Sequence, residues 1–194
     1  MRWIIWLGLV LAFAVPVVLA ANSPLLAWRE PVYIIAGFAG IFALGFLLLQ
    51  PLFAGGYLVG FRGPVGRKAH RWIGFTLVAA VVVHVAGLWV TSPPDVIDAL
   101  TFTSPTPFSA WGVVAMWASF VAAFLAIFRR RLKWHPNVWR IRHAAFATFV
   151  AVGTVVHALL IEGAMEPVSK ALLCVLVLGA TALLWVRLLT SVRR

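Results

Sequence analysis

The sequence predicts an all-α membrane protein, a six-transmembrane-helix bundle in which residues 1–194 form a single transmembrane domain. Three observations lead to this fold class. First, 63% of the residues are hydrophobic and 11% are charged, with a mean hydropathy of +1.03, outside the range of soluble domains. Second, six apolar segments each reach the roughly 20 residues that a helix needs to cross a bilayer. Third, no segment shows the alternating polarity of a barrel strand.

The first apolar segment, at about residues 3–20, admits two interpretations. Arg2, the apolar run and the small residues Val18-Leu19-Ala20 ahead of Ala21 resemble a secretory signal with its cleavage site. The run is long for a signal peptide, and residues 1–21 are therefore interpreted as a retained first helix. Cleavage would leave the orientation of the other five crossings unchanged.

The other five segments are runs of Leu, Val, Ala and Phe separated by proline and glycine, which end helices and form loops. They lie at about residues 31–50, 71–90, 110–128, 141–161 and 168–189. The interruptions are Pro24 and Pro31, residues 60–66, residues 93–107, Pro136 and Pro167. The loops between the segments are too short for a second domain.

Lys and Arg are concentrated in alternate loops, which predicts the orientation of the bundle. The basic residues of one side are Arg62, Arg67, Lys68 and Arg71 in one loop, Arg129, Arg130, Arg131, Lys133, Arg140 and Arg142 in another, and Arg193 and Arg194 in the tail. The intervening loops carry Asp95 and Asp98, Glu162 and Glu166 with Lys170, and Arg29 with Glu30. Both termini are therefore expected to be cytoplasmic, in a multi-pass protein of a bacterial-type cytoplasmic (inner) membrane.

The formal net charge of +11 does not by itself indicate nucleic-acid binding. Because the basic residues cluster at segment ends, they are interpreted as topology signals and as contacts with lipid headgroups. The lipid bilayer is the expected partner of this charge, and no nucleic-acid partner is expected.

Two apolar segments carry a histidine at each end of an equal interval. His70 and His84 bound the run HRWIGFTLVAAVVVH, and His143 and His157 bound the run HAAFATFVAVGTVVH. On a helix the fourteen-residue step spans about 21 Å and falls about 40° short of four full turns. Each pair therefore lies on one helix face, with one histidine near each membrane boundary.

The two histidine-bearing segments run parallel, because one antiparallel segment separates them. His70 is therefore expected to face His143, and His84 to face His157, at two depths. Haem iron takes axial nitrogen ligands from both faces of its macrocycle, so two opposed pairs predict two haems held by His70, His84, His143 and His157. The alternatives are helix–helix hydrogen bonds, a proton relay or a metal-transport site.

Small residues lie one turn from each of these histidines, where a macrocycle edge would pass. They are Gly74, Ala80, Ala147 and Gly153. Small residues are also common in membrane helix interfaces, so this observation only agrees with the haem hypothesis.

Cations lie beside the two histidines nearest the basic loops. Arg67, Arg71, Arg140 and Arg142 are candidates to bind the haem propionates. Each of them also satisfies the positive-inside rule, which is an equally good explanation. His135 lies in the basic loop next to Pro136 and is interpreted as a surface residue.

The runs KAHRWIGFTLVAAVVVH and VWRIRHAAFATFVAVGTVVH resemble the ferric reductase-like transmembrane domain. NADPH oxidases, eukaryotic ferric reductases and the haem-binding membrane subunit of the bacterial periplasmic methionine sulfoxide reductase system share this domain. The resemblance covers about residues 31–185, the core haem-binding bundle. Its most specific parts are Arg67–Gly74 and the two equal histidine spacings. It implies six helices, two b-type haems and electron flow from the cytoplasm to the outer face.

No glycine-rich dinucleotide loop and no catalytic motif is present, so this chain alone is expected to bind no FAD or NAD(P)H. The expected role is that of an oxidoreductase component, the haem-binding membrane subunit. A separate flavoprotein reductase or a quinol would be the electron donor, and a periplasmic protein or a small oxidant the acceptor. Two other functions stay open: a non-redox transporter that handles protons or metal through the histidines, and a structural membrane anchor.

Overall fold

The structure is a computed structural model that describes residues 2–192, with the side chains of residues 3–190. Its long helices are α1 (Arg2–Ala21), α2 (Pro31–Ala54), α3 (Gly63–Thr91), α5 (Pro107–Ile127), α7 (Pro136–Leu160) and α8 (Pro167–Val192). All six are long and apolar enough to span a membrane, and the described residues contain no strand, which confirms the predicted all-α fold class. Arg193 and Arg194, used in the orientation argument, lie outside the described residues.

Proline sets where most of the long helices begin. α2, α5, α7 and α8 each start on a proline, and α3 has Pro64 in its first turn. A proline at the first helical positions loses no helical hydrogen bond and has its φ already near the helical value. Two helices therefore begin well before their apolar runs: α3 at Gly63 and α7 at Pro136, each adding turns that carry basic residues to the predicted segment.

Three short helices lie in segments that were predicted only as loops. They are η1 (Pro24–Leu26), α4 (Pro93–Leu100) and α6 (Arg129–Leu132). α4 begins with two prolines, and Asp95 in its first turn accepts a hydrogen bond of 2.6 Å from the Ser92 hydroxyl. Prolines mark loops in a sequence, but here the same residues start a helix, which hides α4 from the sequence pattern.

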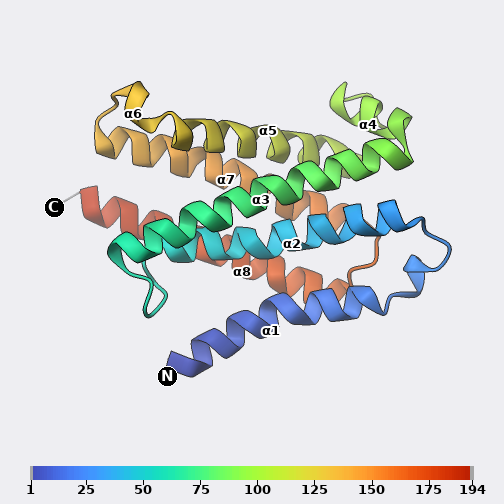
Figure 1. Ribbon diagram of the computed structural model, residues 1–194, viewed down its shortest axis with the longest axis horizontal. Coiled ribbons are helices and arrows are strands. Elements are labelled where there is room, and N and C mark those ends of the chain that lie inside the picture. The colour runs from blue at the N-terminus through green and yellow to red at the C-terminus, as the bar shows by residue number, and fades with distance from the viewer. Residues whose placement is uncertain (1, 193–194) are drawn as a thin grey trace.

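The helices are arranged as two antiparallel hairpins joined by α8 (Figure 1). α2 packs on α3 along its length, and α5 packs on α7 in the same way. α8 contacts α2 and α7, while α3 approaches α5, so these five helices form a ring, with α1 outside it against α8 and α2. Among the described residues, α3 and α7 hardly approach each other. The two histidine-bearing helices thus face each other across the ring.

The ring is filled by an apolar core near the middle of the bundle. Its buried members include Leu44, Leu47 and Leu48 of α2, Leu77 of α3, Ala118 of α5, Val150, Ala151 and Val155 of α7, and Leu173, Cys174, Val177 and Ala180 of α8. Glycine allows the closest helix contacts, because a Cβ on Gly153 would lie 3.1 Å from the Ala115 Cβ. All five helices of the ring therefore share one core.

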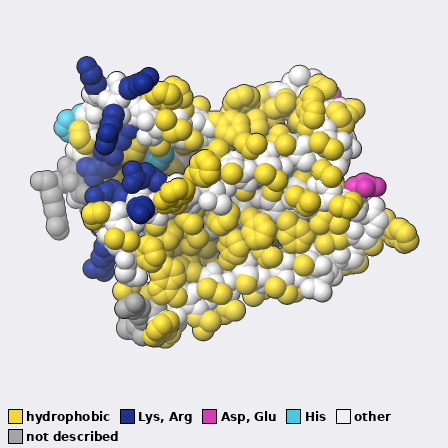
Figure 2. Space-filling view, viewed as in Figure 1, with side chains coloured by type: hydrophobic (Ala, Val, Ile, Leu, Met, Phe, Trp, Pro, Cys, Tyr) yellow, Lys and Arg dark blue, Asp and Glu magenta, His cyan; other side chains and the backbone are white. Residues whose placement is uncertain are grey.

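The charges separate to the two ends of the bundle (Figure 2). The basic end carries the exposed residues Arg62, Arg67, Lys68, Arg71, Arg129, Arg130, Arg131, Lys133, Arg140 and Arg142. The opposite, acidic end carries Asp95, Asp98, Glu162 and Glu166. α1 begins and α8 ends at the basic end (Figure 1). The predicted grouping of loops is therefore present in the structure, and the side on which the cytoplasm lies stays a prediction.

Candidate functional site: two histidine pairs

The structure brings the four histidines together in two pairs at two depths. At the basic-end pair, the ring centroids of His70 and His143 lie 6.1 Å apart, with an interplanar angle of 79°. At the acidic-end pair, the centroids of His84 and His157 lie 6.4 Å apart, at 81°. α3 supplies one ring of each pair and α7 the other, so the histidines face each other as their equal spacing predicts.

The ring separation distinguishes a shared ion from a direct hydrogen bond. Two imidazoles that bind one metal from opposite sides, with bonds of about 2.0 to 2.1 Å, have centroids about 6.2 Å apart. A direct N–H···N hydrogen bond would bring the centroids to about 5 Å. The separations of 6.1 and 6.4 Å match the first arrangement, and no hydrogen bond joins either pair within the described chain.

Three of the four rings are held by a hydrogen bond from Nδ1 to a backbone carbonyl. His84 Nδ1 donates to Ala36 O at 2.7 Å, His157 Nδ1 donates to Phe108 O at 2.8 Å, and His70 Nδ1 lies 3.2 Å from Gln50 O. A carbonyl only accepts, so a neutral ring bonded in this way leaves Nε2 unprotonated. Such bonds fix the tautomer and orientation of metal-binding histidines. They leave Nε2 available as a ligand.

The carbonyls that hold these rings repeat the spacing of the histidines. Ala36 and Gln50 lie fourteen residues apart on α2, antiparallel to His84 and His70 on α3. Phe108, which holds His157, lies on α5. The hairpins α2–α3 and α5–α7 thus present their acidic-end histidines in the same way. No sequence signal marks these positions, because every residue of the partner helix has a backbone carbonyl.

Two glycines make room for the acidic-end rings, and sequence reasoning missed both. A Cβ on Gly40 of α2 would lie 3.1 Å from His84 Nδ1, and a Cβ on Gly112 of α5 would lie 2.7 Å from His157 Nδ1. Each glycine stands four residues after the carbonyl that holds the same ring. Only glycine at position 112 leaves the His157 ring undisturbed, because real Cβ contacts are longer than 3.0 Å.

His143 is held differently from the other three rings. Its Nδ1 is buried and has no hydrogen-bond partner within the described chain. The Ala122 carbonyl, fourteen residues after Phe108, lies close enough to interact with this ring, but its contact with Nδ1 does not have the geometry of a hydrogen bond. The indole of Trp139 stacks on the His143 ring instead, with centroids 5.0 Å apart and planes 10° from parallel.

An apolar layer separates the two pairs. Leu77 lies midway between His70 and His84, and Val150 lies midway between His143 and His157. Both are buried in the central core together with Leu44, Leu47 and Leu48. The space between the two depths is therefore filled by hydrocarbon, which excludes water and ions from it.

The four predicted propionate-binding arginines lie exposed at the basic end, around the histidine pair of that end. Arg140 bonds to the Asn137 side chain, and the Arg142 guanidinium lies 4.3 Å from the centroid of the Trp134 ring. Arg67 and Arg71 are exposed on the first turns of α3. None of the four makes a hydrogen bond or a ring contact with a histidine in the described chain. His135 is exposed at the start of α7, where its Nδ1 accepts a hydrogen bond from the Asn137 backbone N–H, which confirms it as a surface residue.

The small residues beside the histidines have another explanation in the structure. A Cβ on Gly74 would lie 3.5 Å from the Gln50 side chain of α2, and one on Gly153 would press on Ala115 of α5. Gly153 therefore permits close packing within its hairpin, the alternative that the sequence left open, whereas a Cβ on Gly74 would make only an ordinary van der Waals contact. The glycines that the histidine rings require are Gly40 and Gly112.

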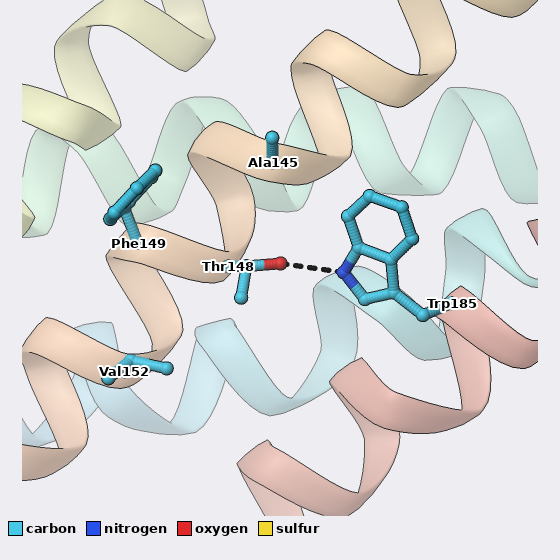
Figure 3. Close-up of a pocket in the computed structure, with 5 residues that line it drawn as sticks. All are labelled: Ala145, Thr148, Phe149, Val152 and Trp185. Carbon is cyan, nitrogen blue, oxygen red and sulfur yellow. Dashed lines mark hydrogen bonds between the residues drawn. The ribbon is translucent and has the colours of Figure 1, made fainter.

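Two grooves on the bundle lie away from the histidines. One groove of about 310 Å³ lies between α7 and α8, lined by Ala145, Thr148, Phe149, Val152 and Trp185 (Figure 3). Its polar atoms already bond to each other, since Trp185 Nε1 donates to Thr148 Oγ1 at 2.7 Å. Another apolar groove lies between α1 and α8. Neither groove offers a free polar group, and the histidine pairs are therefore the candidate site.

Comparison with known proteins gives one result. A family model described as "Ferric reductase like transmembrane component" matches residues 39–154, which contain all of α3 and α5, and both histidine pairs except His157. No curated protein and no solved structure matches the chain.

Proposed function

The chain belongs to the ferric reductase-like transmembrane family, and we propose that it carries electrons across a membrane by means of two b-type haems. One observation carries the proposal. Two opposed histidine pairs lie at two depths, with ring separations of 6.1 and 6.4 Å that suit one iron ion between each pair. The family match supports transmembrane electron transfer, and the histidines supply the means.

Each histidine would act as an axial ligand through Nε2, with Nδ1 of three of the rings bonded to a carbonyl. Haem b held in this way supplies a one-electron Fe(III)/Fe(II) couple at each depth. Because two histidines would hold each haem, no position would be left for substrate at the iron, and donor and acceptor would exchange electrons at the ends of the bundle. The residues that matter there are those that dock a partner.

We assign the basic end to the cytoplasm of a bacterial-type inner membrane, from the positive-inside rule. Arg67, Arg71, Arg140 and Arg142 surround the basic-end pair and suit the two carboxylates of a haem or an acidic donor surface. The donor would be a separate flavoprotein reductase or a quinol. The acceptor would be a periplasmic protein or a small oxidant at the acidic end.

The proposal predicts two b-type haems per chain. The test is a reduced-minus-oxidised visible spectrum of the protein purified from haem-replete cells, with haem quantified per polypeptide. His135→Ala is the matched control, because that histidine is exposed and belongs to neither pair. A preparation without haem absorbance would contradict the proposal and favour a transporter that uses the histidines for protons or metal.

A further inference from the structure

At the basic-end pair, the exposed Arg129 and the largely buried His143 both pack against the indole of Trp139, an arrangement called here the Trp139 stack. The Arg129 guanidinium lies 4.3 Å from the centroid of the Trp139 ring. His143 packs against the same indole, with its ring centroid 5.0 Å from that of Trp139 and an interplanar angle of 10°. Trp139 Nε1 also donates to Leu125 O at 3.3 Å. The indole is therefore fixed by three contacts.

This stack takes the place of a hydrogen bond. His70, His84 and His157 each have their ring plane set by a carbonyl at Nδ1, whereas His143 Nδ1 has no such partner within the described chain. A parallel aromatic contact restricts rotation of the ring about its χ2 angle, because the ring would have to leave the indole face. Trp139 therefore restricts the plane of a ring whose Nδ1 makes no hydrogen bond within the described chain.

Having the Trp139 contact in place of a hydrogen bond at Nδ1 changes the electronic character of the His143 ligand. An Nδ1–H that donates to a carbonyl makes the imidazole a stronger base at Nε2, which favours Fe(III) over Fe(II). His143 lacks that bond. The Arg129 cation, positioned over the Trp139 indole, adds a positive charge near His143. This charge favours the reduced iron centre, which is the less positive one. Both effects raise the reduction potential of the centre that His143 ligates.

We propose that Trp139 is the positioning residue of the His143 ligand and that, with Arg129, it makes the basic-end haem the centre of higher reduction potential. The inference rests on the proposed function. The step concerned is the reduction of Fe(III) to Fe(II) by one electron from an added reductant such as dithionite. No bond is formed or broken, and no proton moves.

The test is an equilibrium redox titration of the purified holoprotein, followed by haem absorbance. The basic-end centre is identified as the one that disappears in His143→Ala. We expect this centre to be reduced first in the wild type. Trp139→Leu should lower its potential by an amount equivalent to about a tenfold change in the reduction equilibrium, about 59 mV for one electron, without moving the other centre. Trp139→Phe keeps a stacking face and should stay near the wild type.

Matched controls separate the stack from general packing and surface charge. Trp134→Leu removes a second tryptophan at the same end, which lies against Arg142 and stacks on no histidine among the described residues. It should move neither centre. Arg129→Gln should lower the potential of the basic-end centre in the same direction as Trp139→Leu, and Arg130→Gln, a neighbouring exposed cation over no ring in the described chain, should have a smaller effect.

The outcomes are distinguishable from a failure of the proposed function. Absence of haem from every preparation would remove the proposed function itself. Two haems with the acidic-end centre reduced first, or an unchanged potential in both Trp139→Leu and Arg129→Gln, would overturn this inference alone. If Trp139→Leu loses the basic-end haem altogether, Arg129→Gln decides, because it alters an exposed side chain and leaves the indole in place.

Discussion

The two histidine pairs have equal spacing along the chain and nearly equal ring separations, but different groups hold them. At the acidic end, both rings donate to backbone carbonyls at 2.7 and 2.8 Å, and both lie against glycines. At the basic end, one ring has a longer contact of 3.2 Å to a carbonyl, and the other stacks on a tryptophan beneath an arginine.

The two pairs therefore illustrate two ways of fixing the orientation of a histidine ring. Backbone carbonyls and glycines orient the acidic-end rings by helix packing alone, so the orientation survives any side-chain change that preserves the packing. The basic-end ring of His143 depends on the identities of Trp139 and Arg129. Side-chain substitutions should therefore alter the basic-end centre in a graded manner, while the acidic-end centre should respond mainly to changes that disturb the helix contact.

The largest expected effect comes from removing the ligands themselves. His70→Ala, His143→Ala and their double mutant should each lose the basic-end haem and retain the other, about one haem equivalent per chain. His84→Ala and His157→Ala should show the reverse. The double mutant should add little to either single change, because both remove the same site. Haem stoichiometry with potentiometric titration measures all of these.

The pairing of histidines by depth would be contradicted if haem loss instead grouped the two histidines of one helix. If His70→Ala and His143→Ala depleted different redox centres, the pairing across the ring would be wrong. A proton relay along one helix would group His70 with His84 and give no selective haem loss. His135→Ala should leave both centres intact.

A smaller effect, confined to the acidic-end pair, is expected from the glycines. In Gly112→Ala the new Cβ would lie 2.7 Å from the His157 ring, and in Gly40→Ala 3.1 Å from the His84 ring. Overpacking of this kind costs about 1–3 kcal/mol. Haem occupancy at the acidic end should fall, more for Gly112→Ala, with the basic-end centre unchanged.

Gly37→Ala is the matched control for the glycine substitutions. It lies on α2 like Gly40, but its added Cβ would meet nothing within 4 Å. Haem quantification and redox titration of the three variants decide. An equal loss of both centres in Gly112→Ala would mean general destabilisation rather than displacement of one ligand.

The sequence was sufficient for the parts of this molecule that depend on one segment at a time. Apolar length predicts the six spans, and helical periodicity with antiparallel connections predicts which histidines face each other. Gly40, Gly112 and the Trp139 stack were not predicted, because they depend on how a neighbouring helix is rotated about its axis. Periodicity along one helix carries no information about that rotation. The short α4 was missed because its prolines also indicate a loop.

The smallest expected effect concerns the stability of the acidic end in acid. Glu166 caps α8, and its carboxylate accepts hydrogen bonds from the backbone N–H groups of Ser169 and Val168, at 2.7 and 2.9 Å. These bonds hold the pKa of Glu166 below its usual value, the bond from Ser169 contributing most. A carboxyl whose pKa is lower in the native state stabilises the fold fully above its unfolded pKa, and this contribution is lost as the pH falls through the native pKa.

Glu166→Gln should therefore lower the melting temperature slightly at neutral pH, and the difference from the wild type should shrink as the pH falls through the native pKa of Glu166. Thermal unfolding of detergent-solubilised protein, followed by circular dichroism, measures it. Glu162→Gln is the control, since that exposed carboxylate accepts no hydrogen bond in the described chain. A constant difference at every pH would show that the cap does not act through its charge.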